Sequence, residues 1–147
     1  MAIGNFIILA LVLVLGVFFQ GAPAFHLFGV KPNLILSALL VAPFFIGLGD
    51  FLLLALFTAT ALAVFPGLGW SILFLPVLGL VGFWLHWFLP WHRVFNLAIL
   101  IAGSTFLLYL LINRQFLFEH WLTVLTEIIY NLFIGLAIFL ILRASRT

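Results

Sequence analysis

The chain has 147 residues, of which 68% are hydrophobic and only 5% are Asp, Glu, Lys or Arg. A water-soluble domain carries roughly a quarter charged residues, so this composition argues against a soluble protein and predicts one that lies in a membrane. Five Lys and Arg residues are too few for a nucleic-acid surface, and the absence of cysteine excludes thiol chemistry and cysteine-bound metals.

Gly, Pro and charged residues divide the apolar sequence, because they interrupt helices or are costly in lipid. A membrane crossing takes roughly 20 residues, so about six crossings with short loops use the whole chain. We therefore expect an all-α, polytopic transmembrane bundle in a single integral membrane domain, 1–147. The expected helices are Ile3–Phe19, Pro32–Gly47, Asp50–Phe65, Ser71–Leu89, Val94–Ile112 and Trp121–Leu142.

Short features mark the first three of these helices. Ala22-Pro23-Ala24 is similar to a signal-peptide cleavage site, but no Lys or Arg precedes the apolar run, so we expect a retained first helix. Pro32 suits the first turn of the second helix, where a missing N–H costs nothing. Asp50 is expected to cap the third helix by accepting hydrogen bonds from free N–H groups. The second and third helices are short, so they are expected to tilt or to enter the bilayer only in part.

The fourth helix is expected to kink at Pro76 and to end in an interfacial anchor. Aromatic and cationic side chains favour headgroup depth, and they gather here as Trp84, Trp87, Trp91, His92 and Arg93. His86 and His92 are six residues apart, which does not fit the usual zinc spacings. We therefore interpret both as interfacial residues.

The distribution of Lys and Arg predicts the orientation. With six crossings both termini share a side with Arg93, Arg143 and Arg146, whereas Lys31 and Arg114 lie on the other side. Because cytoplasmic loops carry more Lys and Arg, we expect cytoplasmic termini.

A polar stripe on the last helix holds the strongest candidate residues. Thr123, Glu127 and Asn131 follow one another at one-turn spacing, and an acid within an apolar segment costs a few kcal/mol (about 3 on insertion scales). One interpretation is a proton site, a ligand site or a contact face for another subunit. The other is an interhelical hydrogen bond that holds the bundle together.

Enzymatic signatures and cofactor motifs are weak. Gly103-Ser104-Thr105 lacks the G-x-S-x-G context of a serine nucleophile, so we interpret it as small-residue packing. No phosphate loop or H-E-x-x-H sequence occurs. We expect no cofactor and no enzyme, although convergence of Asp50, Glu127 and a His in a wet cavity would be the enzyme alternative.

Three segments resemble the MreD family of bacterial rod shape-determining membrane proteins. Phe28-Gly29-Val30-Lys31-Pro32-Asn33-Leu34-Ile35-Leu36 resembles that family's P-N-L signature. Gly47-Leu48-Gly49-Asp50-Phe51 is similar to a contracted G-L-x-x-D segment, in which Asp50 comes one residue early. Glu127-Ile128-Ile129-Tyr130-Asn131 resembles the last-helix pattern with its Tyr-Asn pair.

The resemblance implies a non-enzymatic scaffold in the bacterial inner membrane. Such a scaffold would bind MreC and neighbouring proteins of cell-wall elongation, and the positions that carry over are Pro32, Asn33, Asp50, Tyr130 and Asn131. The family is also similar in helix layout to the substrate-binding subunits of energy-coupling-factor transporters. The alternative is therefore a subunit that binds a small, vitamin-like molecule through Glu127, Asn131 and aromatic side chains.

Overall fold

The computed structural model describes residues 3–22, 29–64 and 69–145, and these residues form an all-α structure. The described helices comprise seven α-helices and two 3-10 helices. In chain order they are α1 (Ile3–Gly21), α2 (Leu34–Val41), η1 (Ala42–Phe44), α3 (Leu48–Val64), η2 (Trp70–Leu73), α4 (Phe74–Leu85), α5 (Arg93–Ile112), α6 (Arg114–Glu119) and α7 (Trp121–Ala144).

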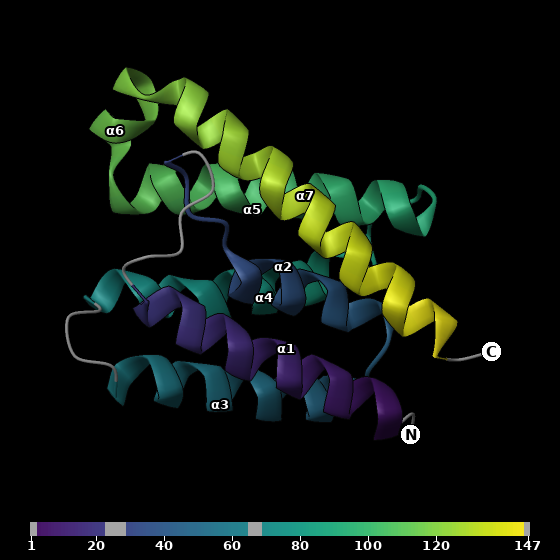
Figure 1. Cartoon of the computed structure of the whole chain (residues 1–147). Helices are drawn as coiled ribbons and strands as arrows, with labels where there is room; N and C mark the ends of the chain where they lie inside the picture. Colours follow the sequence, from purple (N-terminus) through teal and green to yellow (C-terminus); the bar gives the residue numbers. More distant parts are fainter. Residues whose placement is uncertain (1–2, 23–28, 65–68, 146–147) are drawn as a thin grey trace.

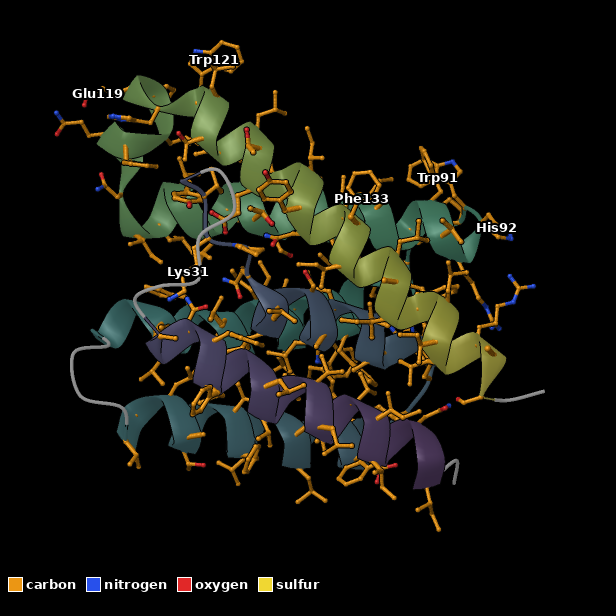
Figure 2. The ribbon with its side chains drawn as sticks, in the orientation of Figure 1. Lys31, Trp91, His92, Glu119, Trp121 and Phe133 are labelled. Atoms are coloured by element: carbon orange, nitrogen blue, oxygen red, sulfur yellow. The ribbon has the colours of Figure 1, made fainter. Side chains whose placement is uncertain are left out.

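The helices are arranged in layers (Figure 1). α5 and α7 cross each other on one side, α1 and α3 lie together on the other side, and α2 and α4 fill the middle. Both ends of the chain come to the same end of the bundle, where the Ser145 hydroxyl donates to Asn5 Oδ1 over 2.7 Å. We call this the terminal end, and Trp91 and His92 also lie there; Lys31, Glu119 and Trp121 lie at the far end (Figure 2).

α2 is the centre of the bundle. Every residue from Ile35 to Val41 is buried, and α2 contacts α1, α4, α5 and α7. Glycines on two neighbours allow this close approach: a Cβ on Gly79 of α4 would lie 2.9 Å from Leu39 Cβ, and one on Gly16 of α1 would lie 2.9 Å from Ile35 Cγ1. Small residues let helix backbones pack closely in membranes, and here they let the protein enclose α2.

Among the described helices, three are long and apolar enough, by length and composition, to cross a membrane: α1, α5 and α7. α3 and α4 are also apolar but shorter, and so is the continuous stretch Leu34–Phe44, which joins α2 to η1. The expected bundle of about six full crossings is therefore only partly seen in the described residues. The eight residues of α2 rise only about 12 Å. Because protein surrounds α2, the bilayer thickness does not set its length.

The second expected helix, Pro32–Gly47, is shorter than predicted. Asn33 is the N-cap of α2, because its Oδ1 accepts from the Leu36 N–H over 3.0 Å. Pro32 is buried and lies before this cap, so its prediction as a first-turn residue is wrong. At the other end, Pro43 lies in the first turn of η1, where the α-helix has already given way to a 3-10 helix.

Pro76 and Asp50 also occupy positions different from those predicted. Pro76 is the third residue of α4 and follows the 3-10 helix η2, so it lies in a first turn and kinks no helix interior. α3 begins at Leu48, so Asp50 lies inside the first turn, beyond the cap position. A carboxylate in the first turn is still stabilised by the positive end of the helix dipole.

α6 lies between the expected helices Val94–Ile112 and Trp121–Leu142, in a segment where the sequence predicted no helix. Asn113 Oδ1 accepts from the Phe116 N–H over 3.0 Å and thereby caps α6. Gln115 Nε2 donates to Glu119 Oε1 over 2.8 Å, one turn further along. This short helix turns the chain from α5 into α7 at the far end of the bundle.

Candidate functional site

Asn131 on α7 is the centre of a buried polar network. Its side chain is fully buried, its Oδ1 accepts from the Asn33 N–H over 2.7 Å, and its Nδ2 donates to Thr105 Oγ1 over 3.1 Å. The Ser37 hydroxyl donates to the Asn131 carbonyl over 3.1 Å. The network therefore ties α7 to the start of α2 and to the middle of α5.

Glu127 lies one turn before Asn131 and is only 6% exposed. The Tyr109 hydroxyl of α5 donates to Glu127 Oε2. The Tyr109 ring stacks on Phe116 at 5.6 Å, and Phe116 stacks on His120 at 4.7 Å. Glu127 is therefore held by α5 and, through the stacked rings, by the turn from α6 into α7.

A cavity of about 340 Å³ opens beside Glu127 at the far end of the bundle. Its wall combines polar and apolar side chains from α1, α5, α6 and α7 and from the segments before α2 and before α6. The polar lining residues are Gln20, Lys31, Asn33, Tyr109, Asn113 and Glu127, and the apolar ones are Leu108, Ile112 and Phe116. Among the described lining residues, Glu127 is the only acid and Lys31 the only Lys or Arg.

The Lys31 side chain caps the C-terminus of α1. Its Nζ donates to the Gln20 carbonyl over 2.6 Å and to the Ala22 carbonyl over 3.2 Å. A cation is favoured at this negative end of a helix dipole, while partial burial lowers the pKa of the Lys31 amine from its usual value. An ammonium group has three donors, and the described residues accept from two of them.

The other predicted polar positions stay outside the network. Thr123 and Tyr130 are partly buried on α7, and neither side chain hydrogen-bonds to another described residue. Asp50 lies in α3, an element that does not line the cavity. Phe28, the first residue of the first MreD-like segment, lies outside the described residues. So do Pro23 and Ala24 of the sequence similar to a signal-peptide cleavage site, and Arg146, which was used to predict the orientation.

Several polar residues of the site were not identified as site residues from the sequence, and they include Lys31, Ser37, Thr105 and Tyr109. Ser37 follows Asn33 by one helical turn, which is a usable signal for a shared polar face. Thr105 and Tyr109 are also one turn apart on α5. Their spacing could have indicated the face of α5 that meets the polar stripe of α7.

The expected interfacial anchor is exposed at the terminal end. Trp84, Trp87 and Trp91 are each more than half exposed, and Arg93 is exposed as well. His92 caps α5, because its Nδ1 accepts from the Val94 N–H over 3.4 Å. Among the described residues, no group of three His, Asp or Glu side chains lies close enough together to hold a metal ion.

In the part of the chain that the structure describes, fold and site together define an all-α protein. Three of the described helices are long and apolar enough to span a membrane, and a buried polar network lies between the helices. Searches of protein-family models, of curated proteins and of solved structures find no match to the chain.

Proposed function

We propose that the chain is a non-enzymatic scaffold of the bacterial cell-wall elongation machinery, similar to MreD, in the inner membrane. It would bind an MreC-like protein and neighbouring synthesis proteins. The observation that carries this proposal is one hydrogen bond between two MreD-like segments. The Asn33 N–H, after Pro32, donates to Asn131 Oδ1 of the Tyr-Asn pair, 98 positions away.

The contact between Asn33 and Asn131 is buried, so it would act within the scaffold and not as a surface for the partner. Asn33 is 4% exposed and Asn131 is 0% exposed, so neither side chain offers much surface to a partner. Their role in the proposal is to hold α2, α5 and α7 in one fixed arrangement. The partner would recognise the outer surface that this arrangement presents.

The orientation belongs to the same proposal. Arg93 and Arg143 lie at or near the terminal end, on the first turn of α5 and the last turn of α7. With the terminal end in the cytoplasm, these cations would follow the positive-inside rule. The cavity beside Glu127 would then open toward the outer face of the membrane.

The test is affinity purification of the tagged chain from its native membrane in mild detergent, with mass spectrometry of the bound proteins. Asn131→Leu removes the central side chain of the network, while Thr126→Ala is the matched control. Thr126 lies on the same helix, and its hydroxyl bonds only within α7, to the Leu122 carbonyl.

The proposal predicts that the wild-type chain and Thr126→Ala retain an MreC-like protein, while Asn131→Leu loses most of it at equal membrane abundance. The conservative Glu127→Asp, which shortens the reach to Tyr109, should lose a smaller fraction. Equal partner recovery by all variants would remove the network from the account. Absence of any cell-wall elongation protein from the wild-type sample would contradict the scaffold itself.

One observation favours a second function, binding of a small vitamin-like molecule as a transporter subunit. The 340 Å³ cavity places the Lys31 cation and the Glu127 acid in one lining, and its volume lies at the lower end of ordinary ligand sites, about 300–1,000 Å³. This function predicts a stoichiometric small molecule in the purified sample, which Glu127→Gln should release. Recovery of such a molecule together with an ATPase-bearing module would replace the scaffold proposal.

A further inference from the structure

The cavity beside Glu127 holds a charge arrangement that the scaffold itself does not require. Its described lining contains one acid, Glu127, and one Lys or Arg, Lys31. No ion pair joins these two residues, and neither pairs with another described charge. Lys31 lies at the far end of the bundle (Figure 2). The cavity therefore presents an acid and a separate cation to a molecule that enters it.

Glu127 is nine-tenths buried yet has few hydrogen-bond partners. It is 6% exposed, and the Tyr109 hydroxyl donates to its Oε2. Asn131 also lies near this carboxyl, but the hydrogen bond that its Nδ2 donates goes to Thr105. Among the described residues, none donates to Glu127 Oε1. Because a buried carboxylate is costly without a cation or several donors, a cation at Oε1 would be stabilising.

The Oε1 atom of Glu127 is accessible from the cavity. Among the described side chains, the atoms that are both fully enclosed and without a hydrogen bond are Asn5 Nδ2 and Asn96 Oδ1. Glu127 Oε1 is not one of them, so it keeps accessible surface although it has no donor. Since Glu127 lines the cavity, a donor placed there can reach this oxygen.

The same lining offers hydrogen-bond donors for an anion. An ammonium group has three donors, and described carbonyls accept from two of those of Lys31. Asn113 uses its Oδ1 to cap α6, and its Nδ2 donates to no described residue. The Gln20 side-chain amide forms no hydrogen bond with a described residue either. One cation with two amides suits an anion that has several acceptor oxygens, as phosphate has.

Apolar side chains complete the wall. Leu108, Ile112 and Phe116 line the cavity together with the polar residues. The Phe116 ring is held between Tyr109 and His120, at ring-centroid distances of 5.6 Å and 4.7 Å. These side chains can contact methylene carbons between a cationic and an anionic group. The cavity volume of about 340 Å³ is near the lower limit of ordinary ligand sites, so the bound group should be small.

From these contacts we propose that the cavity beside Glu127 binds a phosphoethanolamine group, in which two carbons join a primary ammonium to a phosphate. The ammonium donates to Glu127 Oε1, the phosphate accepts from Lys31, and the carbons contact Leu108 and Ile112. This group is the headgroup of phosphatidylethanolamine and also occurs in soluble esters, so experiment must separate the two sources. The site goes beyond the scaffold and does not depend on it, since the purified chain can bind the group without a protein partner.

The test uses the full-length chain, delipidated in mild detergent and titrated with phosphatidylethanolamine while native mass spectrometry counts bound molecules. A parallel titration uses phosphatidylcholine, whose trimethylated nitrogen has no N–H to donate. Two soluble probes follow: glycerophosphoethanolamine, which has the whole group, and ethanolamine, which lacks the phosphate. These comparisons use the wild-type chain and need no variant.

Glu127→Gln is the main variant, because it removes the charge and keeps an oxygen that can accept from Tyr109. Glu119→Gln is the matched control. Glu119 is an exposed acid at the end of α6, at the same end of the bundle, and it does not line the cavity. Circular dichroism of each variant confirms that its helix content equals that of the wild type.

We expect the wild-type chain to bind one phosphatidylethanolamine about tenfold more tightly than phosphatidylcholine, because only the first supplies a charge-assisted hydrogen bond to Glu127. Glu127→Gln should lose this preference, and Glu119→Gln should keep it. Glycerophosphoethanolamine should bind more tightly than ethanolamine, because it alone carries the phosphate. If it displaces the lipid at equal concentration, the proposed group comes from a soluble ester; if it does not, the lipid is the source.

Three results would overturn the proposal. The first is equal affinity of the wild-type chain for phosphatidylethanolamine and phosphatidylcholine. The second is an equal loss of preference in Glu127→Gln and Glu119→Gln, or no loss in a folded Glu127→Gln. The third is binding of ethanolamine as tight as that of glycerophosphoethanolamine, which would remove the phosphate and Lys31 from the site. Loss of the MreC-like partner with headgroup binding intact would contradict the scaffold alone.

Discussion

α2 and α3 are both apolar helices too short for a standard crossing, yet they have different surroundings. α2 is buried along Ile35–Val41, whereas α3 exposes Leu53 by 61% and Leu56 by 63%. What separates them is the small and polar residues that face α2, namely glycines on α1 and α4 and the network around Asn131. Apolar composition alone therefore does not distinguish a helix enclosed by protein from one that exposes its apolar side chains.

The largest effect is expected from removing the polar contact that α2 makes with α7. Asn131→Leu leaves the buried Asn33 N–H without its acceptor and breaks the bond to Thr105. An orphaned buried donor costs up to about 3 kcal/mol, and we expect a loss of that order in the free energy of unfolding. Denaturation in mixed micelles, followed by circular dichroism, measures it. A loss below that of Ser37→Ala would contradict the central place of Asn131.

A matched pair of leucines compares the two helices directly. Leu39 of α2 is fully buried, and Leu39→Ala should cost about 2 kcal/mol, because it opens a cavity inside the protein. Leu53→Ala on α3 removes exposed atoms only, and it should change the free energy of unfolding by less than about 0.5 kcal/mol. The same micelle denaturation applies, and equal costs would mean that the two helices share one environment.

Substitution of Gly79, the glycine of α4 that packs against α2, should have a somewhat smaller effect. A Cβ at position 79 would lie 2.9 Å from Leu39 Cβ, an atom that only a backbone shift can move. Gly79→Ala should therefore cost about 1.5 kcal/mol through overpacking. Gly103→Ala is its control, because no atom lies within 4 Å of the added methyl. The melting temperatures of the two variants are compared in one detergent. Equal melting temperatures for Gly79→Ala and Gly103→Ala would show that α4 does not pack closely against α2.

Ser37→Ala should have the smallest effect of the series. The Ser37 hydroxyl makes one hydrogen bond, to the Asn131 carbonyl, and its removal adds no bulk to the core. Interhelical hydrogen bonds in membranes contribute about 0.6 kcal/mol on average, and we expect a loss of that size. Combining Ser37→Ala with Asn131→Leu in a double-mutant cycle would show whether the two contacts act together, as members of one network should.

The long helices were largely predictable from sequence. Ile3–Phe19, Val94–Ile112 and Trp121–Leu142 end within two residues of α1, α5 and α7, because uninterrupted apolar length is a strong signal. Glu127 and Asn131 were also identified in advance, since polar groups in lipid are costly. These predictions depend on local composition alone.

The centre of the bundle was not predictable in the same way. Lipid and protein interior are equally apolar, so no periodicity in α2 indicates that it lies inside. The partners of the stripe, Thr105 and Tyr109, lie 26 and 18 positions from Asn131 and Glu127. Sequence spacing along one helix does not report contacts across two helices.

The most direct test of the enclosed position of α2 needs no mutation. The purified wild-type chain, reconstituted in phosphatidylcholine vesicles, is exposed to light with a lipid-soluble diazirine, which labels any side chain that contacts lipid. Mass spectrometry then locates the label. The account predicts label on α3 at Leu53 and Leu56 and none over Ile35–Val41. Label over Ile35–Val41 at the density found on α3 would contradict it.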